Sequence, residues 1–158
     1  MHLRTLAALA AILVLPSMAS ALPPPPATLQ GVVNNFIAAL NGTKPEPFAA
    51  LFAQQASITD TLGAYNWQGE DAPTRYFAAL QRAVADAGWA NLQLAPNGAD
   101  TVMGDSAHAY AAVPLFINYA VKGQQKQDRG FFTLSFTAFD GGWKITSATW
   151  TYTSPPSF

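Results

Sequence analysis

The chain has 158 residues, of which 50% are hydrophobic, 12% are aromatic and only 11% are charged. So much apolar mass excludes an intrinsically disordered chain. The net charge of -1, without any run of basic residues, argues against nucleic-acid binding. The absence of cysteine excludes disulfides, thiol nucleophiles and thiolate metal sites.

The N-terminal segment has the parts of a secretory signal peptide over residues 1–21. A positively charged start precedes an apolar run at residues 5–15, and Ala19 and Ala21 give the small residues that a cleavage site needs. The alternatives are a buried helix or a membrane anchor, but the run is shorter than the roughly 20 apolar residues of a membrane span. We therefore expect an exported protein, periplasmic or secreted, with no membrane anchor once the signal is cleaved.

Helical patterns follow a proline-rich spacer. Residues 22–27 include four consecutive prolines, which favour an extended segment. Beyond them, apolar residues recur at three- and four-residue spacing, which predicts helices over residues 27–41, 45–54 and 71–87. A short strand is expected between the second and third helices, at residues 57–60.

After residue 88 the hydrophobic period becomes that of strands, and Asn-Gly and Asp-Gly pairs mark turns. Strands are expected at residues 89–96, 99–103, 107–121, 131–139 and 143–153. The polar segment 122–130 is expected to form a mobile hairpin tip. Helices followed by a strand meander predict an α+β domain.

Four stretches carry a family pattern: FIAALN at residues 36–41, FAALFA with ASITDTLG at residues 48–63, WQG with YF at residues 67–77, and GWKI at residues 142–145. Together they resemble the nuclear transport factor 2-like superfamily, which includes SnoaL-like proteins and ketosteroid isomerases. The resemblance covers residues 28–153 and leaves residues 154–158 as a C-terminal tail.

This resemblance implies a cystatin-like α+β roll, a cone in which three N-terminal helices pack on a strongly curved antiparallel sheet. An apolar pocket would lie at the open end of the cone. Many members of the superfamily pair as homodimers through the outer face of the sheet. In residues 131–139, Phe132 and Leu134 share one face while Phe131 and Ser135 share the other. We therefore expect one face to close the pocket and the other to pack on a second copy.

The resemblance gives Asp60 the position of the general base of the isomerases, which moves a proton beside a carbonyl. In those enzymes a tyrosine and a protonated aspartate stabilise the oxyanion. Phe36 and Ser135 occupy the matching positions here, so both of the family's donors are replaced. The alternative for Asp60 is a strand-end residue that hydrogen-bonds the turn at residues 61–63.

Aromatic side chains could line the pocket of such a cone or simply fill it. Candidate ligand-binding residues are Phe36, Tyr65, Trp67, Tyr76, Asn118, Ser135, Trp150 and Tyr152. Once the signal is removed the chain keeps one histidine, His108, so no histidine-based metal site is expected. No cofactor is expected either.

These observations favour an exported, non-catalytic module that binds a small apolar ligand or a partner chain. The alternative is an isomerase- or dehydratase-type enzyme with Asp60 as general base in an apolar pocket. The surroundings of Asp60 separate the two hypotheses, because a solvent-exposed carboxylate would remove the enzyme interpretation.

Overall fold

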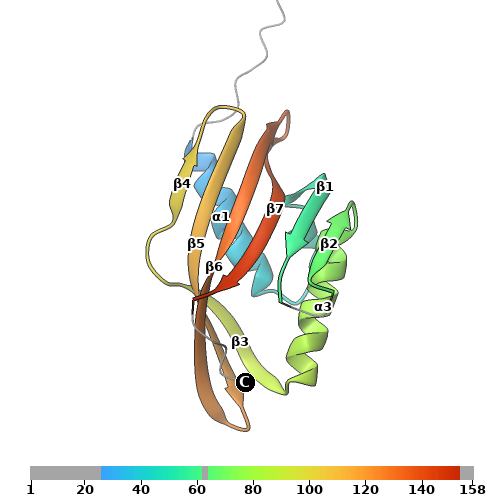
Figure 1. The fold of residues 1–158 in the computed structure, drawn as a ribbon, viewed down its shortest axis with the longest axis vertical. Coiled ribbons are helices and arrows are strands. Elements are labelled where there is room, and N and C mark those ends of the chain that lie inside the picture. Colours follow the sequence, from blue (N-terminus) through green and yellow to red (C-terminus); the bar gives the residue numbers. More distant parts are fainter. Residues whose placement is uncertain (1–25, 62–63, 154–158) are drawn as a thin grey trace, which may run out of the picture.

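The computed structural model describes residues 26–61 and 64–153 (Figure 1). The predicted signal peptide, most of the proline-rich spacer and the tail at residues 154–158 lie outside the described residues. None of the described helices is long and apolar enough to cross a membrane.

The helices are α1 (Pro26–Leu40), α2 (Pro45–Ala49) and α3 (Ala72–Asp86). The first begins at the last of the four prolines, because the fixed φ of proline suits a first helical turn, where its missing N–H is not needed. The side chain of Asn41 ties the end of α1 to the backbone of Leu94: its amide donates to the carbonyl (2.9 Å) and its oxygen accepts from the N–H (2.7 Å).

The strands are β1 (Phe52–Thr59), β2 (Asn66–Gly69), β3 (Trp89–Pro96), β4 (Thr101–Gly104), β5 (His108–Val121), β6 (Gln124–Phe139) and β7 (Gly142–Tyr152). Their order is β2-β1-β7-β6-β5-β3, and β4 also pairs with β5. Figure 1 shows the long strands β5 to β7 bending, with α1 crossing behind them and α3 beside β1 and β2. The predicted α+β roll is confirmed, with one correction: β1 and β7 run parallel in a sheet expected to be antiparallel.

The second helix is shorter than the predicted 45–54, and the first strand is longer than the predicted 57–60. Phe52 already belongs to β1, where it aligns with Ile145 of β7. The N–H of Ile145 donates to the carbonyl of Leu51 at 2.9 Å. Pairing with β7 therefore draws the chain out of the helix, because tertiary context overrides a weak local helix preference.

The short strand β2 is missing from the sequence-based prediction, which assigned no helix or strand between residue 60 and the third helix at residues 71–87. In the structure Trp67 lies opposite Ile58 in an antiparallel pair. A strand of four residues is too short to show a clear hydrophobic period, so only the pairing with β1 reveals it.

The segment 122–130 is not a loop, contrary to the prediction. Lys122 and Gly123 alone form the turn, with φ values of 49° and 80°. Two successive positive φ angles are what a tight two-residue hairpin turn requires. Gln124 pairs with Val121, and β6 continues from there without interruption. The prediction failed because most side chains of this arm are exposed and polar, so their composition resembles that of a loop.

The core lies between the helices and the inner face of the sheet. Alternate residues of the long strands, such as Leu115, Phe132 and Leu134, are buried there, while Phe131 and Ser135 lie half-exposed on the outer face. The predicted division of residues 131–139 into two faces is therefore confirmed.

Candidate functional site

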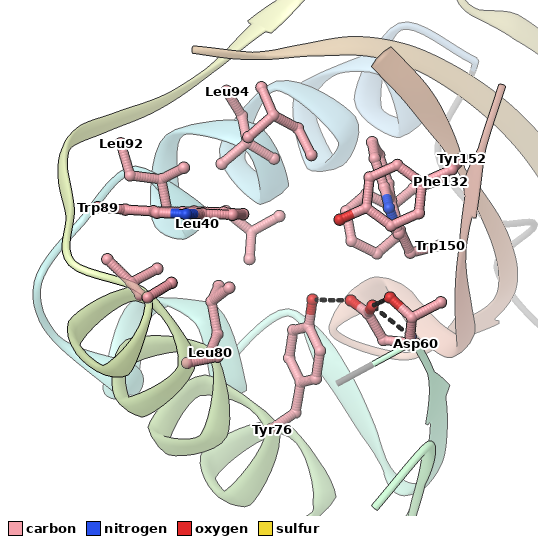
Figure 2. A pocket seen from close by; sticks show the side chains of 15 residues that line it. Leu40, Asp60, Tyr76, Leu80, Trp89, Leu92, Leu94, Phe132, Trp150 and Tyr152 are labelled. Atoms are coloured by element: carbon pink, nitrogen blue, oxygen red, sulfur yellow. Dashed lines mark hydrogen bonds between the residues drawn. The ribbon is translucent and has the colours of Figure 1, made fainter. Parts of the chain in front are cut away.

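A cavity of about 360 Å³ lies between α3, β3 and the inner face of the sheet (Figure 2). This volume is within the roughly 300–1,000 Å³ of small-molecule sites. The lining residues are Leu40, Asp60, Thr61, Tyr76, Leu80, Ala83, Val84, Ala87, Trp89, Leu92, Leu94, Ile117, Phe132, Trp150 and Tyr152. Most are aliphatic or aromatic, and Asp60 carries the one charge among these described lining residues.

An irregularity in β3 turns its side chains into this cavity. Residues separated by three positions point to opposite faces of a regular strand. The register against β5 shifts between Ala90 and Gln93, and Asn91 between them has a φ of 56°. This bulge brings both Trp89 and Leu92 to the cavity, which a regular strand would not do.

Asp60 follows directly after β1, in the connection to β2, and its side chain is buried with 8% exposure. One carboxylate oxygen, Oδ1, accepts hydrogen bonds from the backbone N–H of Thr61 (2.5 Å) and from its hydroxyl (3.2 Å). The other, Oδ2, accepts a bond from the hydroxyl of Tyr76 at 2.7 Å (Figure 2). Asp60 therefore hydrogen-bonds its own turn and also lines the cavity. The sequence had left these two roles open as alternatives, and the structure shows both.

Tyr76 projects from α3 and is fixed by its neighbours. Its ring packs edge-on against Trp67 at a centroid distance of 5.2 Å. Burial raises the pKa of the Tyr76 hydroxyl well above its ordinary value, and the charge and hydrogen bond of Asp60 raise it further. Tyr76 is thus a neutral donor to a buried carboxylate across the physiological pH range.

Tyr152, near the end of β7, places a second phenol on the cavity wall. Burial raises its pKa, and the charges of Asp60 and Asp128 add to the effect, while hydrogen bonding by the Trp150 and Thr61 side chains opposes it. Two carboxylates therefore act electrostatically on one lining residue.

Asp128 lies on the β6 arm that the sequence analysis assigned to a loop. It is only 2% exposed, and the hydroxyl of Tyr119 donates to its Oδ2 at 2.9 Å. Burial and this bond raise the pKa of Tyr119 to about 12. Tyr119 in turn stacks on Trp89 at 4.1 Å, which links Asp128 to the cavity wall.

The structure separates the predicted site residues into three groups. Asp60, Tyr76, Trp150 and Tyr152 line the cavity. Phe36 and Trp67 are buried in the core beside it. The other three lie elsewhere: Tyr65 is 64% exposed, Asn118 bonds Gln127 on the exposed arm, and Ser135 sits on the outer face.

Several lining residues were not predicted, namely Leu40, Trp89, Leu92, Leu94, Ile117 and the C-terminal half of α3. Leu80 and Val84 were recognised as the apolar stripe of a helix, but a stripe does not show whether it meets packed atoms or a cavity. No signal in the sequence indicated the burial of Asp128, because an aspartate is usual in an exposed polar hairpin tip.

His108 belongs to no group of metal-binding side chains among the described residues. His108 is exposed at the start of β5, where its backbone N–H donates to Asp105 Oδ1 at 2.7 Å. In the part of the chain that the structure describes, no three histidine, aspartate or glutamate side chains are close enough together to hold a metal ion.

Sequence comparisons find no matching family model and no matching curated protein. Comparison with solved structures finds a protein with a cystatin-like fold from Caulobacter vibrioides, 21% identical over 80% of this chain and 88% of that one, with a TM-score of 0.65. A nuclear transport factor 2-like superfamily protein from Salmonella enterica is 12% identical over 84% and 95% of the two chains, with a TM-score of 0.67. An NTF2-like protein from Novosphingobium aromaticivorans is 14% identical over 82% of each chain, with a TM-score of 0.66.

The chain therefore has the cystatin-like fold of nuclear transport factor 2-like proteins, as the resemblance in its sequence implied. Identities this low show the fold alone, and a fold of this kind hosts unrelated functions. The function has to be argued from the cavity.

Proposed function

We propose that this protein binds a small, largely apolar molecule in the cavity between α3, β3 and the sheet. The observation that carries the proposal is a cavity of about 360 Å³ with a nearly continuous hydrocarbon and aromatic lining. Transfer of apolar surface from water to such a lining is favourable by about 25 cal/mol per Å². The few polar groups, Asp60 and the nearby phenols, would fix the orientation of the ligand.

The test is titration with an uncharged aromatic probe, 1-naphthylmethanol, followed by calorimetry and by thermal unfolding. A ligand present at 100 times its Kd adds about 2.7 kcal/mol to the free energy of unfolding, which gives a clear rise in Tm. The absence of both heat and a Tm shift with this probe and with its charged analogues would overturn the proposal.

A matched pair of variants on α3 locates the binding. Ala83 lines the cavity, whereas Ala85 is exposed on the same helix. Ala83→Phe should fill the cavity and abolish probe binding, and Ala85→Phe should leave it unchanged. Equal binding by the two variants would place the probe elsewhere on the protein.

A second candidate function, proton-transfer catalysis of the isomerase or dehydratase type, is favoured by the position of Asp60 on the wall of the cavity. The missing donors at Phe36 and Ser135 do not decide the matter, because Tyr152 brings a neutral hydroxyl to the same wall. Asp60 would remove a proton from the carbon beside a carbonyl, Tyr152 would donate to the enolate oxygen, and Asp60 would return the proton.

Exchange of such carbon-bound protons of cyclic ketones in D₂O, followed by NMR, tests this second function. Asp60→Asn should abolish the exchange, and Tyr152→Phe should slow it about a hundred- to a thousand-fold. Exchange that persists in Asp60→Asn would exclude this residue as the base.

We also propose that two copies pair through the outer face of β5 and β6. The centre of this face is weakly charged: Pro114 lies opposite Phe131, and Phe116 lies under the Arg129 guanidinium at 6.0 Å. Interface centres are depleted in charge and enriched in aromatic residues. Sedimentation should give a dimer at micromolar concentration that Phe131→Asp dissociates and Tyr65→Asp does not. A monomeric wild type would contradict the pairing.

Export remains a proposal that rests on the amino-acid sequence of residues 1–21. The expected mature chain begins at Leu22, which mass spectrometry of the protein from the extracytoplasmic fraction would show. Full-length protein confined to the cytoplasm would contradict it.

A further inference from the structure

We propose that the preferred ligand of this cavity is a hydrophobic amine, bound as its protonated form between Asp60 and the surrounding aromatic rings. This inference rests on the proposed binding function and names the class of molecule that the site selects. Three features of the cavity carry it: the sign of the charge in its lining, its aromatic content, and a second buried acid behind its wall.

The first feature is charge. Asp60 lines the cavity, and the lining residues that the structure describes include no lysine, arginine or histidine. The hydrogen bonds to Asp60 given above come from uncharged donors, the Tyr76 hydroxyl and Thr61. Neither of these donors carries a charge. A cation entering the cavity is therefore attracted, and this attraction is stronger in an apolar surrounding than in water.

The second feature is the aromatic content of the lining. Five of the lining side chains, Tyr76, Trp89, Phe132, Trp150 and Tyr152, carry rings. Aromatic faces attract ammonium groups through the ring quadrupole, most strongly when water is excluded. The same rings give an apolar body of the ligand a large contact area. A molecule with a hydrophobic part and one ammonium group therefore uses both properties.

The third feature is Asp128, which is buried on the neighbouring arm and acts electrostatically on Tyr152 together with Asp60. Its contact reaches the cavity wall through Tyr119 and Trp89. Both carboxylates make the potential on this side of the cavity more negative. A ligand carboxylate would be repelled, and a neutral ligand would gain at most a hydrogen bond, without the attraction between opposite charges.

The experiment compares three probes with the same ring system: 1-naphthylmethylamine, 1-naphthylmethanol and 1-naphthoate. Calorimetry of the full mature chain at pH 7 should give an affinity for the amine about tenfold or more above that for the alcohol, because the ammonium adds a charge–charge attraction to its hydrogen bond with Asp60. The naphthoate should bind more weakly than either probe.

Two variants assign the preference to its cause. Asp60→Asn keeps the shape of the side chain and should reduce amine affinity about tenfold, while alcohol affinity changes less than about threefold. Asp140→Asn removes the same charge from an exposed position after β6 and should change neither affinity. Thermal unfolding would show whether Asp60→Asn folds. If it does not fold, the affinities of the three probes for the wild-type chain still test the preference for the amine.

The outcomes separate this inference from the proposed function. If the alcohol binds as tightly as the amine, or more tightly, the preference for amines is wrong and the binding function stands. If the amine preference persists in Asp60→Asn, the assignment to Asp60 is wrong. If none of the three probes binds, the proposed function fails together with the inference.

Discussion

The packed core around Phe36, here called the closed end, and the surroundings of the cavity, here called the open end, use aromatic residues in opposite ways. At the closed end Phe36 packs against Phe48, Phe52 and Phe132, with ring centroids 5.0–6.3 Å apart. At the open end, Tyr76, Trp89, Trp150 and Tyr152 surround a cavity of about 360 Å³. Phe132 belongs to both sets and marks the boundary between them.

This difference follows the chemistry of the side chains. A phenylalanine ring has no polar atom, so close packing satisfies it completely. A buried tyrosine or tryptophan keeps a hydroxyl or an N–H that needs a partner. The phenols of Tyr76 and Tyr119 find theirs in Asp60 and Asp128, both near the open end. Polar aromatic residues therefore gather where the buried acids are, and the rings that gather there do not fill the space.

The largest expected effect is at the closed end. Phe36→Ala removes a fully buried ring and should lower the free energy of unfolding by about 3–5 kcal/mol. Leu92→Ala, at the half-buried edge of the cavity, should cost only about 1 kcal/mol, because less packed surface is lost. Urea unfolding of both variants measures the contrast. Equal losses would show that the two ends are packed alike.

An intermediate effect is expected at the buried carboxylate of Asp60, near the open end. Tyr76→Phe leaves the Asp60 carboxylate without its 2.7 Å donor and should cost about 1–3 kcal/mol. Tyr110→Phe, on the outer face with 38% exposure, is the matched control and should stay within about 0.5 kcal/mol of wild type. An unchanged free energy of unfolding in Tyr76→Phe would mean that this hydrogen bond does not stabilise the fold.

The smallest effect is a dependence on alkaline pH. The folded state raises the pKa of Tyr119 to about 12 and that of Tyr76 well above its ordinary value, so the folded chain holds these protons after the unfolded chain has lost them. Stability contributed by the protonated phenols is therefore complete below about pH 10 and declines as the pH rises toward 12.

Urea unfolding between pH 8 and pH 11 measures this decline. In Tyr119→Phe the free energy of unfolding should decline less steeply with pH, because the variant has no proton to lose at that position. An unchanged slope in Tyr119→Phe would show that other groups cause the alkaline loss of stability.

Local patterns were enough to predict much of the fold. The periods of α1 and α3, the turns of the strand meander and the two faces of residues 131–139 are set by neighbours in sequence, and they are confirmed. The errors fall where distant partners decide: β1 extends upstream because β7 pairs with it, β2 exists because β1 borders it, and the β6 arm is a strand because β5 continues beside it.

For the site, the sequence by itself determined that an acid at position 60 ends the first strand and that the chain is rich in rings. It could not determine which rings line a cavity, since Tyr76, Trp150 and Tyr152 meet Asp60 only when α3 and β7 converge on the end of β1. The bulge at Asn91 and the burial of Asp128 likewise depend on pairing with β5. Hydrophobic pattern fixes which side of an element turns inward, whereas the space left between inward faces depends on how all the elements pack together.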